Sequence, residues 1–311
     1  MSHPAIQLHE VEKSFRVSFG MGHRTALNKL SLSVEPGEIY GFLGPNGAGK
    51  TTSIKILTSL LRPDGGSASV FGQNPALEAT RRRIGFLPES PVFYDHLTGR
   101  EFLHFCGRLC GMENPAVRRR AGELLERVGL EHAANLQIRR YSKGMNQRVG
   151  IAQALIHDPE LIILDEPMSG LDPMGRADVR DLIVDLKKQG KTVFFSTHII
   201  PDVEIICDRI GLVNRGRTIS EGSVQELLSA ARSSTTEVLV QGLAAGCAPP
   251  MANEISASAN HRLFTVDSDQ RLGDLLAMVL AQQARVVAVT PRRETLEDLV
   301  VRVLGQDRAA A

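Results

Sequence analysis

The feature that most constrains this 311-residue chain is a glycine-rich segment at residues 44–51, GPNGAGKT. It follows an apolar run, IYGFL at residues 39–43, and precedes a run with helical spacing, TSIKILTSLL. A glycine-rich loop between a strand and a helix lets backbone N–H groups and the helix N-terminus surround a phosphate. The sequence therefore predicts an α/β domain with a phosphate site.

The loop also carries the side chains that such a site needs. Lys50 is expected to reach the β- and γ-phosphates, and the Thr51 hydroxyl is expected to ligate Mg²⁺. A second apolar run, LIILDE, ends in Asp165 and Glu166. At the edge of a sheet Asp165 can hold the Mg²⁺ shell and Glu166 can act as general base on the attacking water. The alternative is that both acids are N-caps of the next helix.

A third segment, YSKGMNQR at residues 141–148, precedes the helical run VGIAQALI. Ser142 at the start of that helix, with Gly144 beside it, is typical of a second anion site, although such a pattern can also be a simple helix cap. One chain would then have two phosphate-seeking surfaces for one nucleotide. If both contact the same ATP they come from different protomers, and the nucleotide joins a dimer.

Apolar runs alternate with helical patterns for about 220 residues, which is the rhythm of an α/β sheet. This predicts a first domain over residues 1–227, with a helical insert at about residues 92–158, where TGRE has the spacing of a capping box. Residues 228–236, LSAARSSTT, are small and polar and are interpreted as a linker. Residues 237–311 are expected to form a small α+β domain.

Charge and hydropathy exclude several classes of partner. Lys plus Arg is 36 and Asp plus Glu is 35, so the net charge is +1 and no basic excess favours nucleic acid. No apolar run approaches the ~20 residues of a membrane-spanning helix, and the N-terminal residues have no signal-peptide pattern. The sequence therefore predicts a cytoplasmic protein without a membrane span.

Together these motifs resemble the nucleotide-binding subunit of ATP-binding cassette (ABC) transporters over about residues 5–225. The match includes LIILDEP, the MSGLD segment ending in Asp172, and FFSTH ending in His198. The resemblance implies a phosphate-loop ATPase core with a mixed sheet and a helical subdomain, and it makes Glu166, His198 and Lys50 catalytic. It implies that His198 contacts the γ-phosphate and positions Glu166, and that Phe15 stacks on adenine. The residues assigned to the nucleotide are Phe15, Gly44, Pro45, Asn46, Gly47, Ala48, Gly49, Lys50, Thr51, Thr52, Glu89, Ser142, Gly144 and Asp172, and those assigned to the metal are Thr51, Asp165 and Glu89.

Two departures from the family pattern are informative. Glu89 stands where the family usually has Gln, so it can approach Mg²⁺ or the water as a charge, unless it is an ordinary solvated carboxylate. The segment YSKGMNQR at residues 141–148 resembles the family's signature loop, and in it Lys143 and Met145 replace the usual Gly and Gln. With the short C-terminal segment, these features resemble the ATPases of type-2 exporters, which pair with a separate transmembrane permease.

In that family the loop around Glu89 and residues 91–111 form the groove that receives a helix of the membrane subunit. Val92, Phe93 and Tyr94 are the candidate apolar contacts here, and ordinary packing under a loop is the alternative.

The resulting hypothesis is an ATP-binding and ATP-hydrolysing subunit of an ABC exporter, with ATP and Mg²⁺ as cofactors. It would work as a homodimer with composite ATP sites, peripheral on the inner face of the cytoplasmic membrane, with no nucleic-acid partner. An importer ATPase would use the same chemistry. A soluble ABC ATPase of translation or DNA repair is disfavoured by the single cassette, the lack of a heptad run and the near-zero charge.

Overall fold

The computed structural model describes residues 3–16, 22–230, 235–243, 249–250, 252–258, 260–292 and 295–309. The chain divides into two compact units, Met1–Val224 and Gln225–Ala311. Among the described residues, no helix is both long enough and apolar enough to cross a membrane.

The first unit is built on a mixed sheet with the strand order β5-β6-β7-β3-β8-β9. All neighbouring strands in it are parallel except the last pair, β8 and β9. The strands are β3 (Ile39–Leu43), β5 (Ile84–Leu87), β6 (Leu161–Asp165), β7 (Thr192–Thr197), β8 (Arg209–Asn214) and β9 (Arg217–Ser223).

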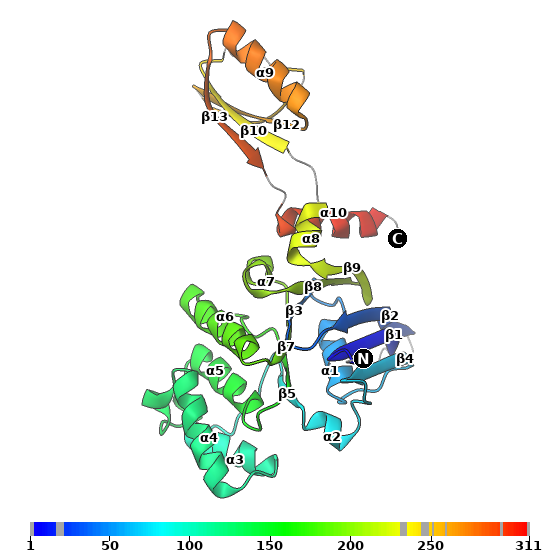
Figure 1. The fold of residues 1–311 in the computed structure, drawn as a ribbon, viewed down its shortest axis with the longest axis vertical. Helices are drawn as coiled ribbons and strands as arrows, with labels where there is room; N and C mark the ends of the chain where they lie inside the picture. Colours follow the sequence, from blue (N-terminus) through cyan, green and yellow to red (C-terminus); the bar gives the residue numbers. More distant parts are fainter. Residues whose placement is uncertain are drawn as a thin grey trace. The chain divides into compact units, whose positions relative to one another are not determined.

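Every residue of β3, β6 and β7 is buried, which explains their continuous apolar runs. Helix α1 (Lys50–Leu57) lies on one side of the sheet and α6 (Pro173–Lys188) on the other (Figure 1). The short helix α7 (Ile200–Ile206) follows β7. The three central strands are therefore protected from solvent, and their carboxyl ends form one rigid edge.

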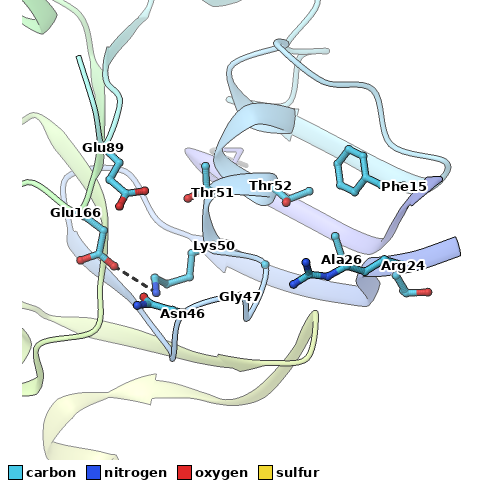
Figure 2. A pocket seen from close by; sticks show the side chains of 12 residues that line it. Phe15, Arg24, Ala26, Asn46, Gly47, Lys50, Thr51, Thr52, Glu89 and Glu166 are labelled. Carbon is cyan, nitrogen blue, oxygen red and sulfur yellow. Dashed lines mark ion pairs between the residues drawn. The ribbon is translucent and has the colours of Figure 1, made fainter. Parts of the chain in front are cut away.

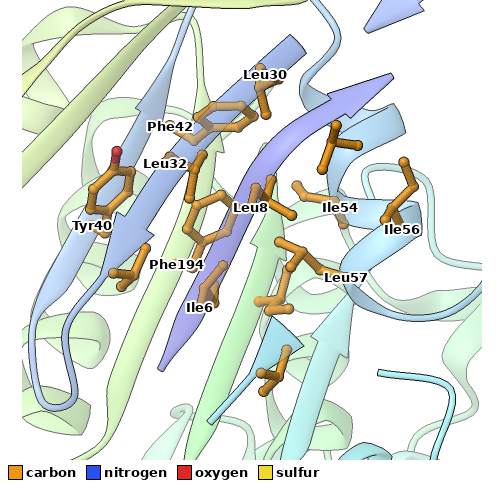
Figure 3. Close-up of a cluster of buried hydrophobic side chains, with 14 of the residues drawn as sticks. Ile6, Leu8, Leu30, Leu32, Tyr40, Phe42, Ile54, Ile56, Leu57 and Phe194 are labelled. Atoms are coloured by element: carbon orange, nitrogen blue, oxygen red, sulfur yellow. The ribbon is translucent and has the colours of Figure 1, made fainter. Parts of the chain in front are cut away.

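A second, antiparallel sheet has the order β2-β1-β4, with β1 spanning Ile6–Arg16, β2 spanning His23–Val34 and β4 spanning Gly65–Val70. Its inner face packs with α1 and the mixed sheet around one apolar cluster (Figure 3). Leu8, Phe42, Ile54 and Phe194 are among its fully buried members. This shared core holds β1 and β2 beside the start of α1.

Helices dominate between β5 and β6, as predicted. They are α3 (Gly99–Leu109), α4 (Asn114–Arg127) and α5 (Lys143–Ala154), with the single-turn helix α2 (Glu78–Arg81) before β5 and short 3₁₀ turns at Glu131–Ala133 and Ile138–Arg140. The predicted capping box of α3 is confirmed. The Glu101 backbone N–H donates to the Thr98 hydroxyl, and the Thr98 backbone N–H donates to the Glu101 carboxylate.

The second unit contains an antiparallel sheet with the order β11-β12-β10-β13. Its core is formed by Val238, Phe264 and Leu275 with their neighbours, and Leu275 lies on helix α9 (Asp269–Ala281). The strands are β10 (Thr235–Gln241), β11 (Asn253–Ala257), β12 (His261–Val266) and β13 (Arg285–Arg292), and the last helix is α10 (Leu296–Ala309).

The linker predicted at residues 228–236 needs correction. Helix α8 (Val224–Ala230) includes residues 228–230, and β10 begins at Thr235. Residues 231–234 lie outside the described residues. The segment VQELLSA forms a helix because it consists largely of residues with good helix propensity, although its last residues are small and polar.

The packing of β5 against α5 yields a stability prediction. A Cβ atom on Gly85 would lie 2.1 Å from the backbone oxygen of Ala154. We expect Gly85→Ala to lower the free energy of unfolding by about 1–3 kcal/mol, because backbone must move to make room. The control is Gly122→Ala on α4, where the added methyl meets nothing within 4 Å; it should be neutral or stabilising by up to about 1 kcal/mol. Urea denaturation measures both, and equal stability of the two variants would contradict the packing described.

Candidate functional site

A cavity of about 560 Å³ lies where α1 begins, between the antiparallel sheet and the carboxyl ends of the central strands (Figure 2). Strand order explains how distant residues reach it. Asp165 at the end of β6 pairs with Ser196 of β7, and Leu43 at the end of β3 pairs with Thr197. The lining residues are Phe15, Arg24, Thr25, Ala26, Asn46, Gly47, Gly49, Lys50, Thr51, Thr52, Glu89 and Glu166.

The glycine-rich loop adopts a backbone that only glycine accommodates well. Gly47 and Gly49 have φ angles of 81° and 110°, in the left-handed region. A Cβ atom on Gly49 would also lie 2.9 Å from the backbone oxygen of Ala26. Helix α1 starts at the next residue, Lys50, so its unpaired N-terminal N–H groups and partial positive charge face the loop. The loop is thus a built anion site.

Lys50 is buried, with 6% of its side chain exposed. Its Nζ donates to the carbonyl oxygens of Gly44, at 2.7 Å, and Pro45, at 3.3 Å. The same nitrogen lies 3.3 Å from Oε1 of Glu166, whose side chain is 7% exposed. A buried ammonium needs such partners because its desolvation is otherwise costly.

Glu166 is held from three sides. Its backbone N–H donates to Ser196 Oγ at 2.9 Å, and its Oε2 lies 2.9 Å from His198 Nδ1, while Oε1 faces Lys50. Its φ of 50° is in the left-handed region, which for a residue with a side chain costs of order 1 kcal/mol or more. Backbone strain of this kind persists where surrounding contacts impose it, which is typical of functional positions.

Asp165 is buried beside Thr51. Burial raises the pKa of this carboxyl, and hydrogen bonds from the Ser196 and Thr51 hydroxyls act in the opposite direction. The bond from Ser196 Oγ to Oδ1 is 2.6 Å long. A carboxylate and a hydroxyl side by side are hard oxygen donors, the set that Mg²⁺ takes alongside phosphate oxygens and water. The donor set therefore fits Mg²⁺.

The other residues predicted for the first site divide into two groups. Phe15 on β1, with 41% of its surface exposed, lines the cavity together with Asn46, Thr52 and Glu89. Ala48 is buried within the loop, and Gly44 and Pro45 supply the carbonyls that bind Lys50.

Ser142, Gly144 and Asp172 lie elsewhere. They line a separate cavity of about 410 Å³ that shares no lining residue with the first. Ser142 caps α5 by accepting from the Met145 backbone N–H at 3.2 Å, and Asp172 caps α6 by accepting from the Gly175 N–H at 3.1 Å. Within one chain the structure does not bring these residues to the phosphate loop.

Sequence reasoning did not include Thr25 and Ala26 among the lining residues, and it missed two further contributors to the site. Arg24 lines the first cavity, and Ser196 bonds to both Asp165 and Glu166. Arg24 belongs to no motif, and Ser196 stands within FFSTH but was given no role there; both are placed by strand pairing, of Arg24 with Phe15 and of Ser196 with Asp165. Only the registers of these strands could have revealed them.

Comparison with known proteins agrees with this geometry. Residues 27–169 match the family model described as ABC transporter. The chain is 42% identical over 313 residues to an ABC transporter ATP-binding protein of Synechocystis sp., covering 97% of this chain and 85% of the relative. It is 37% identical over 316 residues to the daunorubicin resistance ATP-binding protein DrrA3 of Streptomyces coeruleorubidus, covering 99% and 98%. A solved ATP-binding cassette dimer in a post-hydrolysis state, bound to ADP and phosphate, matches with a TM-score of 0.65 and 29% identity over 70% of this chain and 98% of that one.

The fold and the phosphate-loop cavity thus define a nucleotide-binding ATPase domain. The chain belongs to the ABC transporter family, and it is an ATP-binding, ATP-hydrolysing subunit of the export type.

Ser196 offers a test of how the site is held together. In Ser196→Ala, the buried Asp165 Oδ1 and the Glu166 N–H each lose a partner, so we expect the free energy of unfolding to fall by about 1–3 kcal/mol. Ser53→Ala is the matched control, because the Ser53 hydroxyl is equally buried and, among the residues that the structure describes, bonds only to the Gly49 carbonyl, at 3.1 Å. Chemical denaturation compares the two, and a Ser196 variant no less stable than the Ser53 variant would refute the bridging role.

Proposed function

We propose that two copies of this chain close on two ATP molecules, each nucleotide lying between the phosphate loop of one protomer and the Ser142 cavity of its partner. The observation that carries this is the division of the phosphate-seeking residues between two cavities without a common residue. Ser142 uses a lone pair to cap α5, which leaves its O–H free to donate to a phosphate oxygen. Gly144, beside it, presents backbone at the same helix N-terminus. The match to cassette dimers supports this arrangement.

In this arrangement Glu166 acts as general base on the water that attacks the γ-phosphate. His198, bonded to Oε2, holds the carboxylate in position, and Lys50 binds the β- and γ-phosphates. Thr51, Asp165 and Glu89 would hold Mg²⁺ or its water shell, and the ion would neutralise charge on the phosphates. Phe15 is exposed and lines the cavity, so adenine would stack on its ring.

Glu166→Gln is the sharpest test of this mechanism. Gln keeps the shape of the side chain but cannot accept the proton, so we expect ATP turnover to fall ~10²-fold or more while ATP stays bound. The variant should then form an ATP-dependent dimer, detected by light scattering after size exclusion. Glu160→Gln removes a carboxylate that pairs with Arg83 outside the cavity and should hydrolyse ATP normally. Normal turnover by Glu166→Gln would refute the role of Glu166, and a variant that stays monomeric with ATP bound would refute the composite site.

We further propose that a separate transmembrane permease docks on an exposed apolar surface formed by Val92, Tyr94, Phe105 and Leu109, which we call the α3 surface. Val92 is 94% exposed, and the Tyr94 ring packs edge-on against that of Phe105 with centroids 5.2 Å apart. Phe93, the remaining candidate contact, instead packs edge-on against the buried Phe102 and is half-buried. Contiguous exposed apolar side chains are typical of protein interfaces.

Glu89 connects the two proposed functions. It lines the nucleotide cavity, and Val92 lies three residues further along the same loop. A change in what Glu89 contacts at the phosphates can therefore move the α3 surface. Docking to a transmembrane permease would place the protein in the cytoplasm, peripheral on the inner face of the cytoplasmic membrane.

Substitutions on the α3 surface test the docking proposal. We expect Val92→Asp and Leu109→Asp to reduce co-sedimentation with membranes of the native host at least about tenfold, since a charge would be buried against apolar partner atoms. Leu60→Asp places the same charge at another exposed leucine and should co-sediment as the wild type does. ATPase activity of the purified variants verifies folding. Undiminished co-sedimentation of both α3 variants would exclude this surface.

A further inference from the structure

The nucleotide cavity contains a second cation that none of the motifs includes. Arg24 on β2 is the cross-strand partner of Phe15 on β1, so both side chains stand at one end of the antiparallel sheet. Its Nη2 lies 3.7 Å from the position that a Cβ atom would take on Gly47, in the phosphate loop. Figure 2 shows the side chain reaching from its strand toward Gly47.

The Arg24 guanidinium is available for a ligand. The residue is exposed, and within the part of the chain that the structure describes no carboxylate lies within ion-pair distance of it. The carboxylate of Glu166 in the same cavity is already bonded to Lys50 and His198. A free guanidinium that lines a cavity built for a polyanion is placed to bind that anion.

Its position determines which part of the nucleotide it meets. In Figure 2, Phe15 is at one end of the cavity and Lys50 with Glu166 at the other, and Arg24 lies between them. With the base on Phe15 and the γ-phosphate at Lys50, the intervening atoms are the ribose and the α- and β-phosphates. A planar fork of N–H donors matches phosphate oxygens and not the ribose hydroxyls.

We propose that Arg24 binds the α- and β-phosphates of the nucleotide, and that it is a binding residue and not a catalytic one. This rests on the proposed placement of the base on Phe15. Because ATP and ADP share these two phosphates, Arg24 stabilises both to the same extent. It contributes uniform binding, which lowers KM without changing kcat.

The experiment measures the Kd of MgATP, MgADP and adenosine for Arg24→Ala and Arg24→Lys. MgATP is titrated in the Glu166→Gln background at protein concentrations where the chain stays monomeric. We expect Arg24→Ala to weaken MgATP and MgADP alike, each about tenfold, and to leave adenosine affinity unchanged. Arg24→Lys keeps the charge but loses the fork, so its loss should be about threefold. Arg62→Ala removes an exposed arginine that does not line the cavity and serves as the matched control.

Three binding results would overturn the proposal. The first is an unchanged affinity for both nucleotides. The second is a loss of affinity confined to MgATP, which would place Arg24 at the γ-phosphate, and the third is an equal loss of affinity for adenosine, which would place Arg24 at the adenine base or the ribose. A tenfold fall in kcat with unchanged KM would also contradict it. Phe15→Ala separately tests the assumption that adenine lies on Phe15. If adenine does not lie there, this variant will bind adenosine with unchanged affinity. Failure of the composite dimer would appear in the Glu166→Gln dimerisation assay and not in these monomer titrations.

Discussion

The buried contact between Lys50 and Glu166 joins the parts of the chain on which ATP chemistry depends. Each group alone would be expensive to remove from water, so each requires the other, or a phosphate or metal in its place. The loop carbonyls bind Lys50 from one side, and His198 binds Glu166 from the other. The ends of β3, β6 and β7 are thereby fixed to one another by charge as well as by backbone hydrogen bonds.

Strand order makes this contact possible. β7 lies between β3 and β6, so the segment that supplies His198 separates the phosphate loop from the acidic strand end. From this central position the Ser196 hydroxyl donates to the Asp165 carboxylate and accepts from the backbone N–H of Glu166. The left-handed backbone of Glu166 turns the chain sharply after β6 and keeps its carboxylate beside Lys50. The cost of that conformation is offset by contacts with Ser196 of β7, with His198 directly after β7, and with Lys50 of α1.

The sequence predicted those elements whose burial is uniform. The bounds of β3 agree with the apolar run at residues 39–43, and β6 covers the run LIILD that ends in Asp165, because strands buried on both faces read as continuous apolar runs. The edge strands β9 and β11 were missed, since RTISEGS and NEISA are polar and not fully buried. Edge strands are defined by their partner and not by their own composition.

The residues of the site likewise divide into those placed by local sequence and those placed by strand pairing. Lys50 and Thr51 were found because they belong to the glycine-rich loop motif, and Asp165 and Glu166 because they end an apolar run; in both places local sequence determines position. Arg24 and Ser196 occupy strand positions whose neighbours are set by register, and register is a long-range property.

Lys143 shows how a departure from the family pattern is accommodated. A Cβ atom on Gly170 would lie within 3 Å of Lys143 Cε, and Gly170 has a φ of 68°, so a side chain there would meet both a clash and backbone strain. The lysine of the signature loop thus lies across the loop that follows Glu166. In the proposed dimer Ser142 contacts the nucleotide of the partner, whereas Glu166 acts on the nucleotide of its own protomer. In that dimer, the contact between Lys143 and the loop after Glu166 would join the residues that meet the partner's nucleotide to those that act on the protomer's own nucleotide.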